Sequence, residues 1–195
     1  MTAAGAPLRV TICGIDELPQ HGAAGVTHVL SILDPGWPEP EAFLRFDPHR
    51  RLELRFHDVL APVSGSTIVP NGEHVARLLE FGREVAALGA AAHLLVHCHA
   101  GVSRSTAATA LLFAQADPSR SAGAIFDDIA RLRPRAWPNL RMLELGDRAL
   151  GRGGTLVAAV VAQYRRVLAE DPDFGQRLRE GGRDREVTLA EAQRS

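Results

Sequence analysis

The sequence predicts an α/β fold in which a central, mostly parallel sheet of four to five strands is flanked by helices. Short apolar runs rich in β-branched residues alternate with segments of helical period in the first part of the chain. Helical segments dominate the later part. This order is typical of a layered fold whose helices cover a largely parallel sheet.

The size and composition of the chain favour one compact domain. The chain has 195 residues, of which 46% are hydrophobic, enough to enclose a sizeable core. We expect residues 1–170 to form this single domain. Residues 171–195 are charged and interrupted by glycines, and we expect a mobile C-terminal tail there, with a short helix possible over 188–194.

The charge balance excludes some partners. The formal net charge is −1, so no basic field favours nucleic acid, and no polybasic cluster favours a membrane surface. The two cysteines, Cys13 and Cys98, are too few for a secreted disulfide scaffold. No signal peptide is evident, and the apolar segment "TLVAAVVAQY" is too short to span a bilayer. We therefore expect a soluble, cytoplasmic protein.

Four segments are predicted to be strands. The first, "LRVTIC", is rich in β-branched residues, and the second, "THVLSIL", is closed by the turn-rich "DPGWPEP". The third, "RLELRF", alternates polar and apolar residues, and the fourth, "HLLVHC", is short and mostly apolar. They cover residues 8–13, 27–33, 51–56 and 93–98.

A long loop and five helices complete the prediction. The loop over residues 57–70 has no sustained period and a length that usually serves a function. The first helix has an apolar stripe and Asn71 as its N-cap, the third stops at Pro134, and Asn139 caps the fourth. The helices cover residues 71–88, 104–116, 121–133, 139–151 and 155–170.

The stretch "LLVHCHAGVSRST" (94–106) joins the fourth strand to a helix through a loop of small residues. In such a connection, backbone N–H groups converge near a helix N-terminus that carries partial positive charge. This concavity suits an anion of the size of phosphate, at the strand ends where open α/β sheets bind ligands.

Cys98 lies at the entrance of this loop. A free thiol has a pKa of about 8.5, and a helix N-terminus with a nearby cation lowers it markedly. Arg104 supplies the cation, and its planar fork also suits two phosphate oxygens. Gly101 permits a tight turn, and Ser105 is placed to hydrogen-bond the thiolate. The sequence therefore predicts a thiolate nucleophile within a phosphate site.

The segment "HCHAGVSRS" resembles the phosphate-binding loop of the cysteine-dependent protein tyrosine phosphatases: His-Cys, five residues, Arg, then Ser or Thr. It is most similar to the dual-specificity branch, and the whole chain to compact bacterial members. The later "RPRAWPN" is similar to a segment whose Asn braces the loop, here Asn139. The resemblance implies a phosphotyrosine protein phosphatase-like fold, with a phosphate held by His99, Ala100, Gly101, Val102, Ser103 and Arg104.

The resemblance also implies a two-step reaction. Thiolate attack gives a cysteinyl-phosphate, which water then hydrolyses. One carboxyl on a mobile loop acts first as acid and then as base, and Asp58, which follows the third strand, fits this role. His97 is implied to hydrogen-bond the backbone and to position Cys98. No metal or cofactor is expected, because loop amides and Arg104 stabilise the charge.

Simpler interpretations stand beside these. Asp34 competes with Asp58 for the acid role, although a turn explains it well, and Asp47 is also interpreted as a turn residue. Cys13 fits core packing better than redox chemistry. The "HCH" run does not indicate a metal site, because adjacent strand residues point to opposite faces. Trp37 and Trp137 are interpreted as packing residues or as lining of a substrate groove. A set of four arginines is interpreted as a solvated face: Arg131, Arg133, Arg135 and Arg141.

Three functions follow from these residues. The first is hydrolysis of phosphotyrosine, with phosphoserine, phosphothreonine or a small phosphomonoester as further substrates. The residues between Cys98 and Arg104 include no permanent cation, which disfavours phosphoinositides. The second function is phosphate or phosphoprotein binding without turnover. The third is sulfur transfer or arsenate reduction, which usually requires a resolving thiol.

Overall fold

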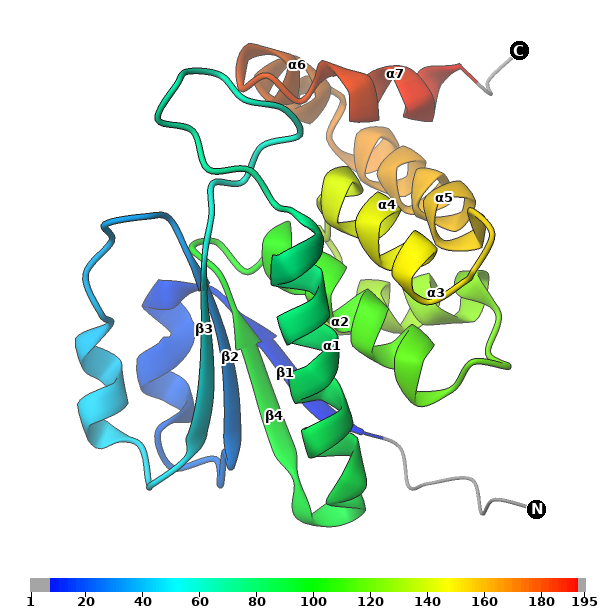
Figure 1. Ribbon diagram of the computed structural model, residues 1–195. Coiled ribbons are helices and arrows are strands. Elements are labelled where there is room, and N and C mark those ends of the chain that lie inside the picture. Colours follow the sequence, from blue (N-terminus) through cyan, green and yellow to red (C-terminus); the bar gives the residue numbers. More distant parts are fainter. Residues whose placement is uncertain (1–7, 193–195) are drawn as a thin grey trace.

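The computed structural model describes residues 8–192, which form a four-stranded sheet between two layers of helices (Figure 1). All pairs of neighbouring strands are parallel, and the order in the sheet is β1-β4-β2-β3. The strands are β1 (Arg9–Cys13), β2 (His28–Leu33), β3 (Arg50–Arg55) and β4 (His93–His97). The predicted α/β class is confirmed, and each strand lies within one residue of its predicted bounds.

The five predicted helices are present. They are α1 (Gly72–Ala87), α2 (Arg104–Ala116), α3 (Ala122–Leu132), α4 (Leu140–Ala149) and α5 (Thr155–Glu170). Three 3-10 helices occupy segments that the sequence analysis treats as connections: η1 (Ile15–His21), η2 (Glu41–Arg45) and η3 (Gly89–Ala91). Their shortness explains why no apolar period marks them.

The two faces of the sheet bury separate cores. The larger core lies under the α-helices and includes Cys98, whereas a smaller core lies under η1 and η2 and includes Cys13 (Figure 1). Successive strand residues point to opposite faces, so Leu94 belongs to the larger core and Leu95 to the smaller one. Cys13 thus packs as a core residue, as predicted, and on a different face from Cys98.

Helix α2 lies at the centre of the larger core. Its residues from Arg104 to Leu112 are all buried, and several of them are alanines. Small side chains let neighbouring elements approach closely, and α2 contacts β4, α1, α3 and α4. Helix α2 is therefore packed against several elements, and its buried first turn anchors the loop that precedes it.

The C-terminal segment differs from the mobile tail that the sequence favours. Asp171 caps α6 (Pro172–Glu180), and α7 (Asp184–Glu191) follows. Both helices pack against α5 (Figure 1). The Val187 side chain is completely buried. Most charges on these helices face outward, but Glu186 of α7 is completely buried. Residues 1–7 of the predicted domain and 193–195 of the predicted tail lie outside the described residues.

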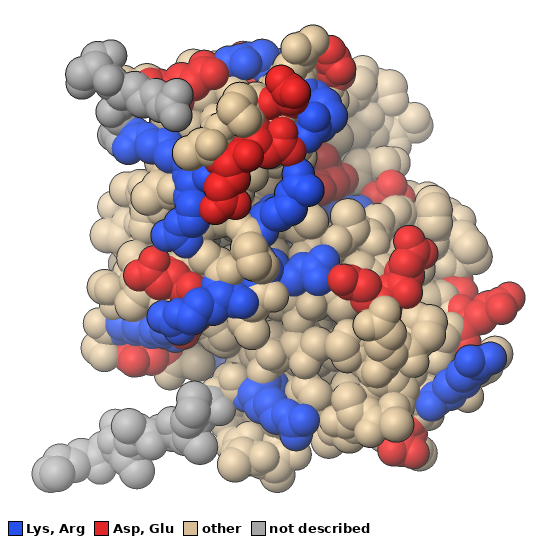
Figure 2. Space-filling model, turned by 180° about the vertical axis from the view of Figure 1, so that it is seen from behind, with Lys and Arg blue, Asp and Glu red and all other residues tan. Residues whose placement is uncertain are grey.

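The surface carries charges of both signs. On the face shown in Figure 2, arginine side chains are interspersed with acidic ones. Among residues 8–192, no helix combines the length and the apolar character needed to cross a lipid bilayer.

Candidate active site

The loop that the sequence predicts to bind phosphate spans residues 98–103, between β4 and α2. Its turn depends on Gly101, whose φ of +69° lies in the left-handed region that favours glycine. A Cβ at Gly101 would lie 2.5 Å from the carbonyl carbon of Cys13 and 2.6 Å from the Gly14 nitrogen. The loop therefore packs directly on the end of β1.

Cys98 lies at the floor of this loop, and only 2% of its surface is exposed. Its Sγ is 3.3 Å from Oγ of Ser105, which is fully buried in the first turn of α2. A hydroxyl donor and a helix N-terminus both stabilise a thiolate relative to a thiol. The structure thus brings together the two residues that the sequence pairs.

Arg104 begins α2 and is 3% exposed. Its Nη1 donates to Asp34 Oδ1 at 2.6 Å and to the Phe56 carbonyl at 2.7 Å. Its Nε is buried and has no hydrogen-bond partner within residues 8–192. A buried donor without a partner is costly, and a phosphate oxygen at the loop would satisfy it. Asp34, which directly follows β2, thus orients the Arg104 guanidinium.

Asp58 lies beside the loop and is held by three donors. Its Oδ1 accepts from Ser103 Oγ at 2.8 Å, from Asn139 Nδ2 at 2.8 Å and from Arg183 Nη1 at 3.1 Å. Burial by itself raises the pKa of Asp58, but Arg183, Arg104 and the hydrogen bonds outweigh it and hold the pKa below its usual range. The Asp58 carboxyl is therefore ionised in the free protein at neutral pH.

The segment before α4 braces the loop through its backbone. The Trp137 N–H donates to the Val102 carbonyl at 2.9 Å, and the Asn139 N–H donates to the Ser103 carbonyl at 3.3 Å. The Asn139 side chain is fully buried, and its Oδ1 accepts from Met142 N–H, which caps α4. Asn139 thus combines the bracing contacts with the N-cap that the sequence predicts.

Two of the arginines interpreted as a solvated face have other contacts. Arg133 donates from Nε to the Gly101 carbonyl and from Nη2 to the Ala100 carbonyl, both at 3.1 Å. Arg141 donates from Nε to the Pro70 carbonyl at 2.7 Å and so ties down the loop after β3. Spacing along a helix does not reveal such contacts, because the acceptors are backbone groups far away in the sequence.

The two histidines that flank Cys98 have different surroundings. The His99 ring lies against Trp37 in a tilted arrangement, with ring centroids 4.3 Å apart, and its Nε2 accepts from the Asp34 N–H at 3.2 Å. His97 is completely buried, and within residues 8–192 neither ring nitrogen is hydrogen-bonded. The ring of His97 lies against Phe43, with ring centroids 5.5 Å apart, and keeps a weak interaction with the Cys98 backbone, so the positioning role expected of His97 stays a prediction.

A cavity of about 300 Å³ opens over the loop. Cys98 and Arg104 line one side, and Phe174, Leu178 and Arg183 of the C-terminal segment line another. These three residues were not predicted, because the charges and glycines of residues 171–195 favour a mobile tail. Trp137, one of the two tryptophans considered for a groove, also lines this cavity.

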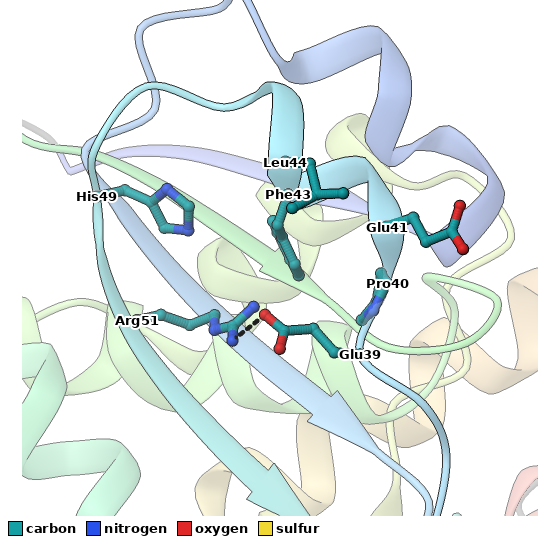
Figure 3. A pocket seen from close by; sticks show the side chains of 7 residues that line it. All are labelled: Glu39, Pro40, Glu41, Phe43, Leu44, His49 and Arg51. Carbon is teal, nitrogen blue, oxygen red and sulfur yellow. Dashed lines mark hydrogen bonds and ion pairs between the residues drawn. The ribbon is translucent and has the colours of Figure 1, made fainter.

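A second hollow, of about 460 Å³, lies around η2 (Figure 3). It is formed by Phe43, Leu44 and the ion pair between Glu39 and Arg51, among others. None of the predicted site residues lines it, whereas Asp58, Cys98 and Arg104 line the first cavity.

Comparison with family models and with curated proteins gives no match. Comparison with solved structures gives similar folds, and three of these structures are described here. Human DUSP28 is 20% identical with a TM-score of 0.55, covering 73% of this chain and 88% of that one. Tk-PTP in its active form is 18% identical with a TM-score of 0.54, covering 78% and 99%. PTPMT1 in complex with PI(5)P is 18% identical with a TM-score of 0.53, covering 74% and 91%.

The chain has a dual-specificity phosphatase fold. The predicted phosphatase-like architecture is confirmed at the level of the fold. Within this phosphatase fold, the loop after β4 and the start of α2 hold Cys98 and Arg104 together.

Proposed function

We propose that the protein is a phosphomonoester hydrolase, a protein tyrosine or dual-specificity phosphatase that acts through a cysteinyl-phosphate on Cys98. The observation that carries this proposal is the buried Nε of Arg104, which has no partner among residues 8–192 and lies beside the loop that begins at Cys98. The Sγ of Cys98 is 3.3 Å from the Ser105 Oγ of α2. A phosphate dianion at that place satisfies the guanidinium and lies against the sulfur.

In the first step, the Cys98 thiolate attacks phosphorus and the bond from phosphorus to the leaving oxygen breaks. The electron pair moves to the leaving oxygen, which takes a proton from the carboxyl of Asp58. In the second step, Asp58 takes a proton from water, the water oxygen attacks phosphorus, and the sulfur departs as a thiolate. Ser105 donates to that thiolate and eases its departure.

The acid role of Asp58 sets the pH range of the reaction. Because Arg183 and Arg104 help to hold the pKa of Asp58 below its usual range, its acid form is abundant only in acidic solution. Rates with poor leaving groups should therefore rise as the pH falls toward that pKa.

The cavity supports an aryl phosphate as substrate. Phe174 and Leu178 provide an apolar wall facing the loop, where an aromatic ring packs well. Burial and the Arg104 guanidinium lower the pKa of His99, with Asp34 and Asp58 offsetting part of the effect, so His99 adds no charge at neutral pH. PTPMT1 shares the fold and binds PI(5)P. In this chain the five residues between Cys98 and Arg104 include no lysine or arginine, which favours a substrate with a single phosphate group.

The second candidate is a binding module without turnover. The fold is shared with human tyrosine phosphatase-like serine/threonine/tyrosine-interacting protein, which is 20% identical with a TM-score of 0.51 and covers 72% of this chain. Sulfur transfer and arsenate reduction have less support, because Cys13 and Cys98 lie in different cores.

Both cysteines are free thiols, which favours a reducing compartment such as the cytoplasm.

Hydrolysis of p-nitrophenyl phosphate and of a phosphotyrosine peptide tests the proposal. We expect release by the wild type between pH 5 and 7, complete loss in Cys98→Ser, and full activity in the control Cys13→Ser. Peptide binding without release by the wild type favours the binding module. A Cys98→Ser variant as active as the wild type rejects Cys98 as the nucleophile.

A further inference from the structure

The C-terminal segment inserts an arginine into the candidate active site. Arg183 precedes α7, and only 6% of its surface is exposed. Its Nη1 lies 3.1 Å from Asp58 Oδ1, and both Nη1 and Nη2 lie 3.2 Å from Ser103 Oγ. One guanidinium thus contacts both the predicted acid and the phosphate loop, across 125 and 80 residues of sequence.

A buried carboxylate fixes this guanidinium. Glu186 of α7 is completely buried and accepts from Nε and Nη2 of Arg183, both at 2.7 Å. The same carboxylate accepts from Trp137 Nε1 at 2.7 Å and from Leu140 N–H at 2.9 Å. Glu186 therefore joins α7 to the segment that braces the loop, and it leaves the guanidinium little freedom to move.

We propose that Arg183 is a positioning residue that fixes the Asp58 carboxylate beside the phosphate loop, so that α6 and α7 are a working part of the active site. The proposal rests on the proposed phosphatase function and deepens it. Figure 1 shows the arrangement that makes this possible, since α6 and α7 lie beside the loop that follows β3.

Arg183 is not a second phosphate site. Its guanidinium lies between two carboxylates, Asp58 and Glu186, so the three groups together carry a net negative charge. A phosphate that entered there would meet this charge. Repulsion at that place directs the dianion to Arg104, whose Nε is a buried donor without a partner in the described part of the chain.

The charge of Asp58 depends on several groups that face it. Arg183 and Arg104 stabilise its anionic form, as do the hydrogen bonds from Asn139 and Ser103. Three further titratable groups interact with the site, namely His99, Tyr164 and Glu186. Arg183 is the one cation among them that comes from the C-terminal segment and directly contacts the Asp58 carboxylate.

The test compares Arg183→Gln and Arg183→Lys with Arg185→Gln, a matched control on α7 whose arginine pairs with Glu144 at the surface. The first readout is the pH profile of kcat/KM with phenyl phosphate, a poor leaving group, and with p-nitrophenyl phosphate. The second readout needs no turnover: a carboxyl ¹³C NMR titration of Asp58, assigned by its loss in Asp58→Asn.

In Arg183→Gln we expect the high-pH limb of the phenyl phosphate profile and the Asp58 titration to move upward by about one pH unit or more, because a neighbouring cation is lost. We expect the low-pH kcat for phenyl phosphate to fall more than that for p-nitrophenyl phosphate. Arg183→Lys should show a smaller change and Arg185→Gln none. In an Asp58→Asn background, Arg183→Gln should shift no limb.

Equal losses for both substrates with an unshifted limb and an unshifted titration overturn the proposal and leave Arg183 a purely structural role. If the wild type hydrolyses neither ester, the proposed function fails, and the NMR titration still decides whether Arg183 controls Asp58. If Arg183→Gln does not fold, Arg183→Lys decides through the comparison of substrates, because lysine cannot reproduce the guanidinium geometry and equal losses for both esters in that folded variant contradict the proposal.

Discussion

Acidification of the protein from pH 7 to pH 5 tests the buried imidazole of His97. Burial lowers the pKa of His97 from 6.5 to about 4, and a weak interaction with the Cys98 backbone offsets part of the effect. Since the folded-state pKa lies below the unfolded one, the unfolded chain binds the proton more readily between these two values. The stability associated with neutral His97 is fully present above 6.5 and declines as the pH falls toward about 4.

The expected loss follows from these two values. One pKa unit corresponds to about 1.4 kcal/mol, so a difference of about 2.5 units limits the whole effect to about 3.4 kcal/mol. At pH 5 most unfolded molecules carry the proton on His97 and most folded ones do not. We therefore expect a loss of about 2 kcal/mol in the free energy of unfolding between pH 7 and pH 5 from this residue alone.

Urea unfolding of the wild type and of His97→Leu at both pH values measures this loss. Leucine has a similar volume and does not titrate, and other histidines with lowered pKa values, such as His93, titrate in both proteins. We expect His97→Leu to lose about 2 kcal/mol less than the wild type upon acidification. An equal loss in the two proteins would refute the reasoning, because it would show that His97 carries the same charge in the folded and unfolded chains.

Three further predictions concern the site. Gly101→Ala should lose at least about 1 kcal/mol of stability and about 100-fold in kcat/KM, because the Cβ meets the Cys13 backbone at 2.5 Å. Gly151→Ala is the control, since its φ is +63° and no atom lies within 4 Å of the added Cβ, and equal activity loss in both would contradict the argument. Glu186→Gln should lose about 3 kcal/mol in urea unfolding, because it weakens a buried ion pair, and an unchanged midpoint would contradict this. Asp58→Asn should slow phenyl phosphate turnover by on the order of 100-fold while inorganic phosphate still inhibits, and unchanged rates would transfer the acid role to another group.

The strands and the long helices were predictable from local patterns. Apolar runs and helical periods need only neighbouring residues, so the bounds of β1 to β4 lie within one residue of the prediction. The 3-10 helices are too short to show a period. The C-terminal segment misled the sequence analysis because its charges are numerous, whereas the few residues that dock it, such as Val187 and Glu186, are isolated.

The site, too, was predictable only in part. The motif around Cys98 and Arg104 could be predicted, because the loop residues are contiguous and their spacing is fixed by the turn into α2. The partners of these residues are not contiguous. Asp34 contacts Arg104 across 70 residues, and Arg183 contacts Asp58 across 125.

The sequence by itself determined the α/β class, the loop proposed to bind phosphate and the residues proposed to react, because each depends on a short stretch of chain. Only the tertiary structure decided the charge of Asp58, the orientation of Arg104 and the place of the C-terminal helices. These depend on the approach of charged groups from distant segments, and a pKa responds to distance and burial rather than to position in the chain.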